Sequence, residues 1–214
     1  MILTDEAAAR HWLEQLREYD QDARARIDHM VALLADENAR QNLVSSTSLN
    51  EVWRRHVADS AQLLRFVSRE TGLTWLDLGS GAGFPGLVIA ALWPDCAMTL
   101  VESRPRRAEW LERARIAMDL PQVKVEAKSL EQIDSASFQV ISARAFAPLP
   151  KLLDLSARFS TATTFWLLPK GRSAPQELEG LAGWQHMFHV EQSLTDPEAG
   201  IIVGTLTGKK GENP

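Results

Sequence analysis

The segment LDLGSGAGFPG, from Leu76 to Gly86, contains the residue types that bring a nucleotide close to a protein backbone. Its glycines lack a Cβ atom, so they adopt positive φ easily and let backbone N–H groups approach a ligand. They are Gly79, Gly81, Gly83 and Gly86. Glu102 follows the loop at about 20 residues, the spacing at which a carboxylate binds ribose hydroxyls. The pattern predicts a site for adenosine; the alternative is that the glycines serve only a tight turn.

Two cofactor classes fit such a site. The last three glycines match G-x-G-x-x-G, the fingerprint of NAD-binding proteins, in which a helix N-terminus favours a pyrophosphate. Asp77 stands two residues before Gly79, where a carboxylate would repel a pyrophosphate. The same carboxylate suits the ammonium group of S-adenosylmethionine, or it positions the loop. In AKSLEQI, the residues Ser129 to Glu131 are placed to contact an adenine. These features favour S-adenosylmethionine, with an NAD-dependent oxidoreductase as the alternative.

The elements that must position these residues begin at Thr74. Short β-rich runs alternate there with helical patterns, which predicts a mostly parallel sheet covered on both faces. The runs are TWLDL, AMTLVE, VKVEA, FQVIS, TFWLLP, HMFHVE and GIIVGTL. The last two, His186–Glu191 and Ile201–Leu206, are joined by turn formers and predict an antiparallel hairpin. We therefore expect an α/β fold, a Rossmann-like class I methyltransferase sheet of seven strands, because dehydrogenases normally continue into a sizeable substrate domain.

The residues before the sheet have helical periodicity. Ile27, Met30, Val31 and Leu34 form one apolar stripe. The S-x-x-E spacing of Ser48 and Glu51 predicts a capping box at the start of a further helix. We expect an N-terminal helical extension over residues 1–72, a cofactor-binding domain over 73–207 and a loose tail over 208–214.

The charge composition limits how the chain could bind nucleic acid. The formal net charge of −5 argues against binding nucleic acid through bulk electrostatics. Local arginines remain: five of them (104, 106, 107, 113 and 115) lie between Val101 and Arg115 beside three glutamates. A solvated helix face and a phosphate-contacting face are both compatible with that stretch.

Other classes of site are disfavoured. Cys96 is the only cysteine, and the five histidines lack metal-ligand spacing, so we expect neither a disulfide nor a bound metal. The apolar runs fall short of the ~20 residues that cross a bilayer. We expect a cytoplasmic protein without membrane attachment, working as a monomer.

Five segments resemble those of the RsmG family, also called glucose-inhibited division protein B, the bacterial methyltransferases that act on guanine N7 of 16S ribosomal RNA. They are NLVSS (Asn42–Ser46), RHVADS (Arg55–Ser60), DLGSGAGFPG (Asp77–Gly86), SARAFAPL (Ser142–Leu149) and PKG (Pro169–Gly171). The resemblance covers most of the chain. It implies S-adenosylmethionine as cofactor, and 16S ribosomal RNA or an assembling small subunit as partner. A small-molecule methyltransferase is the next alternative.

The resemblance also implies roles for single residues. Gly79 and Phe84 would line the cofactor pocket, Leu130 and Glu131 would flank the adenine, and Arg144 would close the site as its catalytic residue. The sequence departs from common patterns twice: Val44 stands where the family usually has threonine, and Gln139 where many methyltransferases have an acid before the fourth strand.

Guanine N7 carries a lone pair and no proton, so alignment matters more than acid–base chemistry. Arg144 and Phe146 offer a cationic fork and an aromatic face at the end of the fourth expected strand. His56 and Asp59 lie on one helical face, where they either hold each other or face the substrate. The candidate phosphate contacts are Arg54, Arg55, Lys170 and Arg172.

Overall fold

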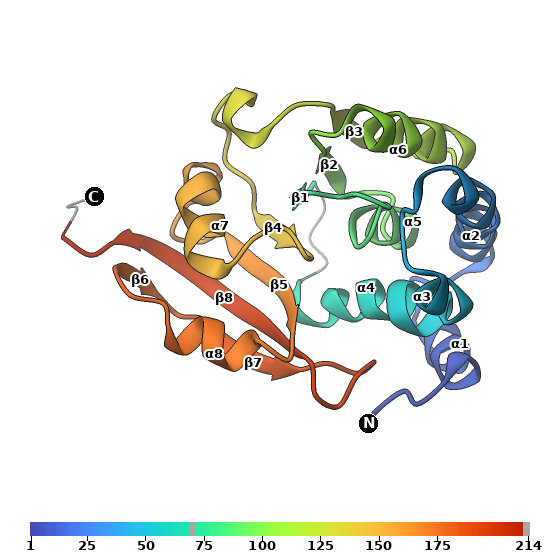
Figure 1. Ribbon diagram of the computed structural model, residues 1–214, viewed down its shortest axis with the longest axis horizontal. Coiled ribbons are helices and arrows are strands. Elements are labelled where there is room, and N and C mark those ends of the chain that lie inside the picture. Colours follow the sequence, from blue (N-terminus) through green and yellow to red (C-terminus); the bar gives the residue numbers. More distant parts are fainter. Residues whose placement is uncertain (69–71, 212–214) are drawn as a thin grey trace.

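The computed structural model describes residues 1–68 and 72–211, and within these it forms one eight-stranded sheet in the order β3-β2-β1-β4-β5-β8-β6, with β7 also paired to β8. The strands are β1 (Thr74–Leu78), β2 (Ala97–Val101), β3 (Val123–Glu126), β4 (Val140–Ala143), β5 (Phe165–Gly171), β6 (Trp184–His186), β7 (His189–Gln192) and β8 (Gly200–Lys209). Strands β1 to β5 pair in parallel, and β8 runs antiparallel to β5, β6 and β7. The expected parallel sheet with a C-terminal antiparallel hairpin is confirmed (Figure 1).

Helices cover both faces of this sheet. They are α1 (Glu6–Glu14), α2 (Gln21–Gln41), α3 (Ser46–Asn50), η1 (Trp53–Ala58), α4 (Asp59–Ala61), η2 (Gln62–Phe66), α5 (Gly86–Leu92), α6 (Pro105–Ala117), η3 (Leu130–Gln132), α7 (Leu149–Ser156), η4 (Ala157–Phe159) and α8 (Ala174–Glu179). Side chains alternate along each strand, so Trp75 packs with one layer while Leu76 and Leu78 pack with the other. This alternation produces two hydrophobic clusters, one on each face.

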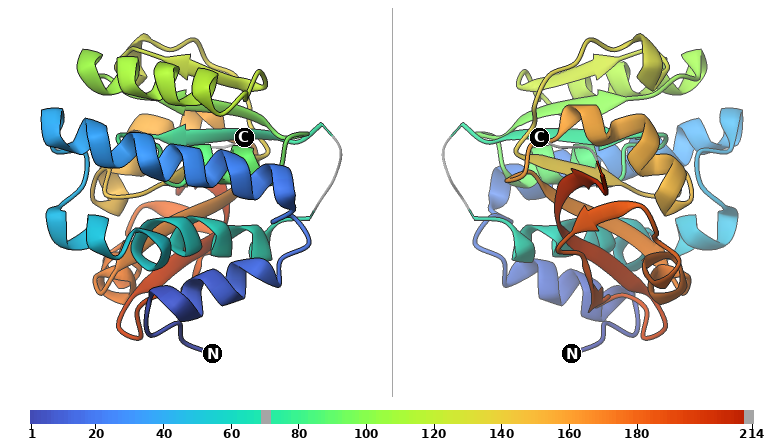
Figure 2. Two further views of the ribbon diagram at one scale, coloured as in Figure 1. Left: turned by 90° about the vertical axis from the view of Figure 1, so that its right-hand side faces the viewer. Right: turned by 90° about the vertical axis from the view of Figure 1, so that its left-hand side faces the viewer.

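The N-terminal helices belong to the same core as the sheet. Trp12, Ile27 and Trp53 share a hydrophobic cluster with Trp75 and Leu100. Helix α2 contacts α5 and α6, and Figure 2 shows it lying across one face of the molecule. Residues 1–68, the described part of the extension expected over residues 1–72, therefore pack onto the sheet as a layer of it.

At strand β1 the order in which strands are added to the sheet reverses, from one side of β1 to the other. The connection through α5 leads to β2 on one side of β1, and β4 pairs on its other side. In open α/β sheets, a crevice forms at the carboxyl ends of strands flanking such a switch point. The glycine loop follows β1 directly and leads into α5, so the fold places it in this crevice.

The sequence predicted seven strands, and the described residues form eight because two short strands stand where one was expected. Strand β6 ends at His186, the first residue of the expected run His186–Glu191, and β7 begins at His189; both pair with β8, with an irregular register at Gln185 and His186. Gly204 of β8 has φ of 138°, and a Cβ there would collide with the carbonyl oxygen of Met187. The glycine thus allows the backbone between the two short strands to bend against β8.

Two boundaries also differ from expectation. Strand β8 continues to Lys209, which pairs with Trp184, beyond the limit of 207 expected for the sheet domain. The helix cap lies at Ser45, whose side chain accepts a hydrogen bond from the backbone N–H of Ser48, so the predicted capping box at Ser48 was wrong. Glu51 instead pairs with Arg54.

Candidate functional site

A cavity of about 310 Å³ lies at the carboxyl ends of β1 to β4, and we call it the cofactor cavity. It brings together four residues expected to bind the cofactor: Gly79, Glu102, Leu130 and Glu131. Gly79 follows β1, Glu102 follows β2, and Leu130 and Glu131 follow β3, so the parallel pairing of these strands makes the four residues neighbours. The cavity thus gathers four of the nine residues that the sequence assigned to the cofactor, and their binding of a cofactor stays a prediction.

Glu102 is held in a fixed orientation at the end of β2. One carboxylate oxygen accepts a hydrogen bond of 3.1 Å from the backbone N–H of Gly81, and the other accepts one of 2.9 Å from the backbone N–H of Arg104. Carboxylate oxygens retain further lone pairs after one bond each. The buried carboxylate therefore fits the expected ribose-binding role.

Three cationic residues of the cofactor cavity were not predicted as part of it: Arg104, Arg107 and Lys128. The sequence contained a signal, because two of them stand within five residues of Glu102 in ESRPRR. The sequence left this arginine cluster open between a solvated helix face and a phosphate-contacting face, and neither interpretation placed it at the cofactor. The structure places Arg104 and Arg107 at the cofactor cavity, whereas Arg106 lines the cavity between α2 and α6.

The glycines of the loop have different surroundings. Gly79 lines the cofactor cavity with φ of 66°, while Gly81 lies next to Arg107 and Glu102 with φ of 54°. Gly83 faces inward, because a Cβ there would lie 2.5 Å from Leu87 and 3.1 Å from Met30. Gly86 packs against Leu100 and Asp77 in the same way. The structure therefore gives Gly83, which was expected at the cofactor, a packing role.

Asp77 lies beneath the loop. Its carboxylate is completely buried, with Oδ1 accepting a hydrogen bond of 2.6 Å from Ser142 and Oδ2 close to the start of α5 at Gly86. Burial raises the pKa of Asp77 to about 6, against the hydrogen bonds from Ser142 and neighbouring groups that lower it. Of the two roles considered for Asp77, this placement favours positioning the loop.

A second cavity of about 830 Å³ adjoins the first, and we call it the substrate cavity. Five residues predicted to contact substrate line it: Arg55, His56, Asp59, Phe146 and Lys170, together with Arg144. Ala145 and Phe146 line both cavities. The loop after β4 is thus the wall between them.

Arg144 connects this loop to the N-terminal helices. Its Nη1 donates to the carbonyl oxygen of Arg55 at 3.2 Å and to Oδ2 of Asp59 at 3.4 Å. Its Nη2 donates to Nδ1 of His56 at 3.0 Å. The planar guanidinium therefore holds three groups of η1 and α4 at once.

His56 is neutral and oriented. An arginine cannot accept a hydrogen bond, so the contact with Arg144 requires Nδ1 of His56 to be unprotonated and assigns the proton to Nε2. Burial, together with the charges of Arg144 and Arg55, lowers the pKa of His56 to about 3. The ring stacks on Phe84 with centroids 4.7 Å apart, and Phe84, expected in the cofactor pocket, is buried behind it.

Asp59 is held by one partner nearby in the sequence and by others far from it. Its Oδ1 accepts hydrogen bonds from Thr195 at 2.7 Å and from Gln62 at 2.9 Å. His56 and Asp59 each contact Arg144, so the pair expected from their spacing acts through that residue. Thr195 was missed from the sequence, where it gave no signal.

The basic residues differ in the exposure of their side chains and in the ion pairs that they already make, and so in their availability to RNA. The side chain of Arg55 is 46% exposed and lies 3.8 Å from Asp196, whereas that of Arg54 is 18% exposed and is paired with Glu51. The Lys170 side chain is only 7% exposed and bonds Glu177 and the carbonyl oxygen of Ala147. Arg172 is exposed and paired with Glu198. Arg55 is therefore the best-placed candidate, and Lys170 anchors the loop that carries Phe146.

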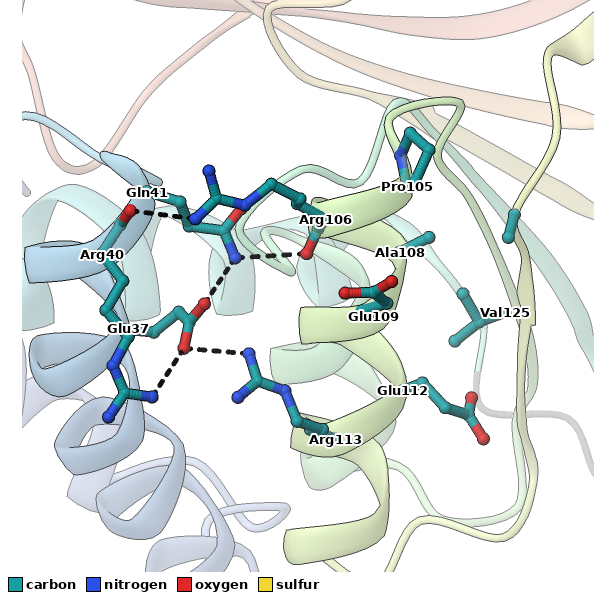
Figure 3. Close-up of a pocket in the computed structure, with 11 residues that line it drawn as sticks. Glu37, Arg40, Gln41, Pro105, Arg106, Ala108, Glu109, Glu112, Arg113 and Val125 are labelled. Carbon is teal, nitrogen blue, oxygen red and sulfur yellow. Dashed lines mark hydrogen bonds and ion pairs between the residues drawn. The ribbon is translucent and has the colours of Figure 1, made fainter.

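A further cavity of about 860 Å³ lies between α2 and α6 and extends to Val125 and Ala127 at the end of β3 (Figure 3). Its charges satisfy one another: Glu37 pairs with Arg113 at 2.9 Å and Arg40 at 3.6 Å, and accepts a hydrogen bond from Gln41. Figure 3 also shows Glu109 and Glu112 on its rim. We do not assign the reaction to this surface, and the C-terminal half of α6 behaves as a solvated, ion-paired face.

Within the described ranges, no cluster of three or more histidine, cysteine or acidic side chains is arranged to hold a metal ion. Among the same residues, none of the helices combines the length and apolar character required to span a bilayer.

Comparisons with known proteins agree with this geometry. A family model described as GidB, rRNA small subunit methyltransferase G, matches residues 23–195. A protein of Novosphingobium aromaticivorans named ribosomal RNA small subunit methyltransferase G is 55% identical over 217 residues, covering 100% of this chain and 94% of the relative. A protein of the same name from Erythrobacter litoralis is 58% identical over 205 residues, covering 95% and 97%.

A solved structure of a SAM-dependent methyltransferase from Aquifex aeolicus superposes with a TM-score of 0.57 at 14% identity, covering 78% of this chain and 95% of that one. At this identity the likeness concerns the fold alone. The class I methyltransferase fold predicted from the sequence is confirmed.

Proposed function

The chain belongs to the rRNA small subunit methyltransferase G family, and from this premise we propose that it transfers a methyl group from S-adenosylmethionine to N7 of a guanine in 16S ribosomal RNA. The name shared by its relatives supports RNA of the small ribosomal subunit as the substrate class. We further propose that it works in the cytoplasm as a monomer, on 16S RNA or an assembling small subunit.

The observation that carries this proposal is the junction of two cavities at Ala145 and Phe146. One cavity has a glycine backbone and an oriented carboxylate, and the other has Arg55 and Arg144. A donor and an acceptor held in adjoining cavities need only alignment to react. The first 72 residues contribute Arg55, His56 and Asp59 to this junction, so we propose that they form part of the substrate site.

The residues of the cofactor cavity fit S-adenosylmethionine, which supplies a methyl group activated by a sulfonium. Glu102 would hold the ribose hydroxyls, and Leu130 with Glu131 would flank the adenine. Arg104 and Arg107 would hold the carboxylate of the methionine end. Asp77 would support the glycine loop from below by fixing the start of α5. Gly83 would support it by allowing the loop to pack on the core.

The substrate cavity supports a reaction controlled by alignment. Guanine N7 has no proton to remove, so the chain need not supply a general base. The Nδ1 atom of His56, the position from which this ring would accept a proton, is already occupied by Arg144. We propose that Arg144 fixes the loop and the N-terminal helices around the base, that Phe146 offers a stacking face, and that Arg55 meets a phosphate.

Mass spectrometry of nucleosides from 16S ribosomal RNA tests the function. Cells without the gene are expected to lose one 7-methylguanosine, and the gene encoding the native chain is expected to restore it while Arg144→Ala does not. Loss of a different methylated nucleoside would contradict the N7 assignment. An unchanged set of methylated nucleosides in 16S RNA would contradict this substrate.

A further inference from the structure

The ring of Phe146 lies directly on the glycine loop. A Cβ at Gly79 would lie 2.5 Å from Cδ2 of Phe146 and 3.4 Å from two further ring atoms. Gly79 is also the loop glycine that lines the cofactor cavity. The close approach that the missing Cβ permits is therefore made by an aromatic side chain of the protein itself.

The same ring borders the substrate cavity. Ala145 and Phe146 line both cavities, so a change in the position of this ring alters both spaces together. An aromatic side chain contributes roughly 150–250 Å² of surface. If the ring moves away from Gly79, the backbone of the glycine loop therefore becomes exposed in the cofactor cavity. The ring then adds a large apolar face to the substrate cavity.

The flanks of the loop are fixed more firmly than the ring. On one side, Arg144 makes three hydrogen bonds to η1 and α4. On the other side, Lys170 donates to the carbonyl oxygen of Ala147 at 2.6 Å, and Glu177 accepts from the backbone N–H of Leu149 at 2.8 Å. Phe146 is only half-buried and is held by packing. Rotation of its side chain therefore leaves the anchors of the loop in place.

We propose that Phe146 couples the two cavities: a cofactor that reaches the backbone of Gly79 displaces the ring from it and turns the ring toward the substrate cavity. The turned ring then stacks on the target base. This inference rests on the proposed function, because it requires that the two cavities take a cofactor and an RNA base. Coupling of this kind is reciprocal, so each ligand strengthens binding of the other by the same factor.

Binding measurements test the coupling without turnover. Affinity for unmodified 16S ribosomal RNA, transcribed in vitro, is measured by filter binding with and without saturating S-adenosylhomocysteine, and the reverse experiment uses calorimetry. For the native chain we expect S-adenosylhomocysteine to tighten RNA binding about fivefold or more, with an equal effect of RNA on S-adenosylhomocysteine. Phe146→Ala is expected to reduce the factor to less than about twofold, and to bind S-adenosylhomocysteine alone at least as tightly as the native chain.

Two further variants separate this role from a general loss of structure. Phe146→Tyr keeps an aromatic face and is expected to keep the coupling. Phe138→Ala removes a half-buried ring from the same hydrophobic cluster, beyond the other end of β4, and is also expected to keep it.

Independent binding of the two ligands by the native chain, or full coupling in Phe146→Ala, would overturn the inference and leave the proposed function standing. Failure of the native chain to bind either ligand would instead count against the proposed function, and the inference would fall with it.

Discussion

The hydroxyl of Ser142 donates a hydrogen bond of 2.6 Å to Oδ1 of Asp77, joining β4 to β1 at the point where the sheet changes direction. Both residues are completely buried. The other oxygen of Asp77 lies against Gly86, where α5 begins. One carboxylate thus ties the strand before the glycine loop to the neighbouring strand and to the helix after it.

The buried carboxylate makes stability depend on pH. The pKa of Asp77 is raised by burial to about 6, above its usual 3.8, so the folded state binds a proton that the unfolded state has released between these values. Its contribution to stability therefore falls as pH rises from about 4 to 6. Because Asp77→Asn removes this titration, the stability of the variant relative to the native chain should rise over that range, on the order of 1–3 kcal/mol.

Urea unfolding of both proteins at several pH values measures this difference. A difference independent of pH would show that Asp77 does not titrate as described. The same variant separates the two roles considered for Asp77: retained S-adenosylhomocysteine affinity supports a positioning role, and a large loss supports direct contact with the cofactor.

The sequence predicted the part of the cofactor cavity whose geometry follows from the fold. Parallel strands end at one edge of the sheet, so Gly79, Glu102 and Leu130 meet once β1, β2 and β3 are recognised. The direction that each glycine faces was not predictable in the same way. The inward packing of Gly83 depends on Leu87 and on Met30 of α2, which tertiary contacts alone bring together.

The substrate cavity was harder to predict for the same reason. Arg54 and Arg55 are adjacent in the chain, yet one pairs with Glu51 and the other lines the cavity, because successive residues of a helix face different directions. The burial of Lys170 follows from Glu177 of α8 and from Ala147 of the loop after β4, which the fold brings to the same side chain. Patterns of residue type identified the candidates but carried no information about their partners.

Substitutions of two loop glycines are expected to affect different properties, ligand binding in one case and stability in the other. Gly81→Val should abolish S-adenosylhomocysteine binding, because φ is 54° and the added side chain would reach Arg107 and Glu102 of the cofactor cavity. Gly86→Ala should instead reduce stability by roughly 1–3 kcal/mol, because its methyl group meets Leu100 and Asp77 in the core. Calorimetry and thermal unfolding of both variants distinguish the two effects. Native affinity in Gly81→Val, or tight NAD binding by the native chain, would contradict the cofactor assignment.

Charge reversal tests the RNA surface. Arg55→Glu should weaken binding to 16S ribosomal RNA and reduce its salt dependence by about one unit for the lost phosphate contact, while S-adenosylhomocysteine affinity remains. Arg24→Glu is the matched control, because Arg24 is a similarly exposed arginine on α2 outside the substrate cavity. Filter binding at several salt concentrations gives both slopes. Equal slopes for the native chain and Arg55→Glu would move the RNA surface elsewhere.

The last prediction separates alignment from acid–base chemistry. The methyl-transfer rate should be nearly flat between about pH 6.5 and 9, because N7 carries no proton and the pKa of His56 is lowered to about 3, leaving that ring neutral throughout the range. Arg144→Ala should lose turnover, because it releases His56, Asp59 and the backbone of Arg55 together. Arg144→Lys should rescue poorly, since an ammonium lacks the planar fork that holds all three. Single-turnover rates on unmodified 16S ribosomal RNA measure both effects. A steep rise in the chemical step around pH 7, or full activity in Arg144→Ala, would mean that alignment by this residue does not control the reaction.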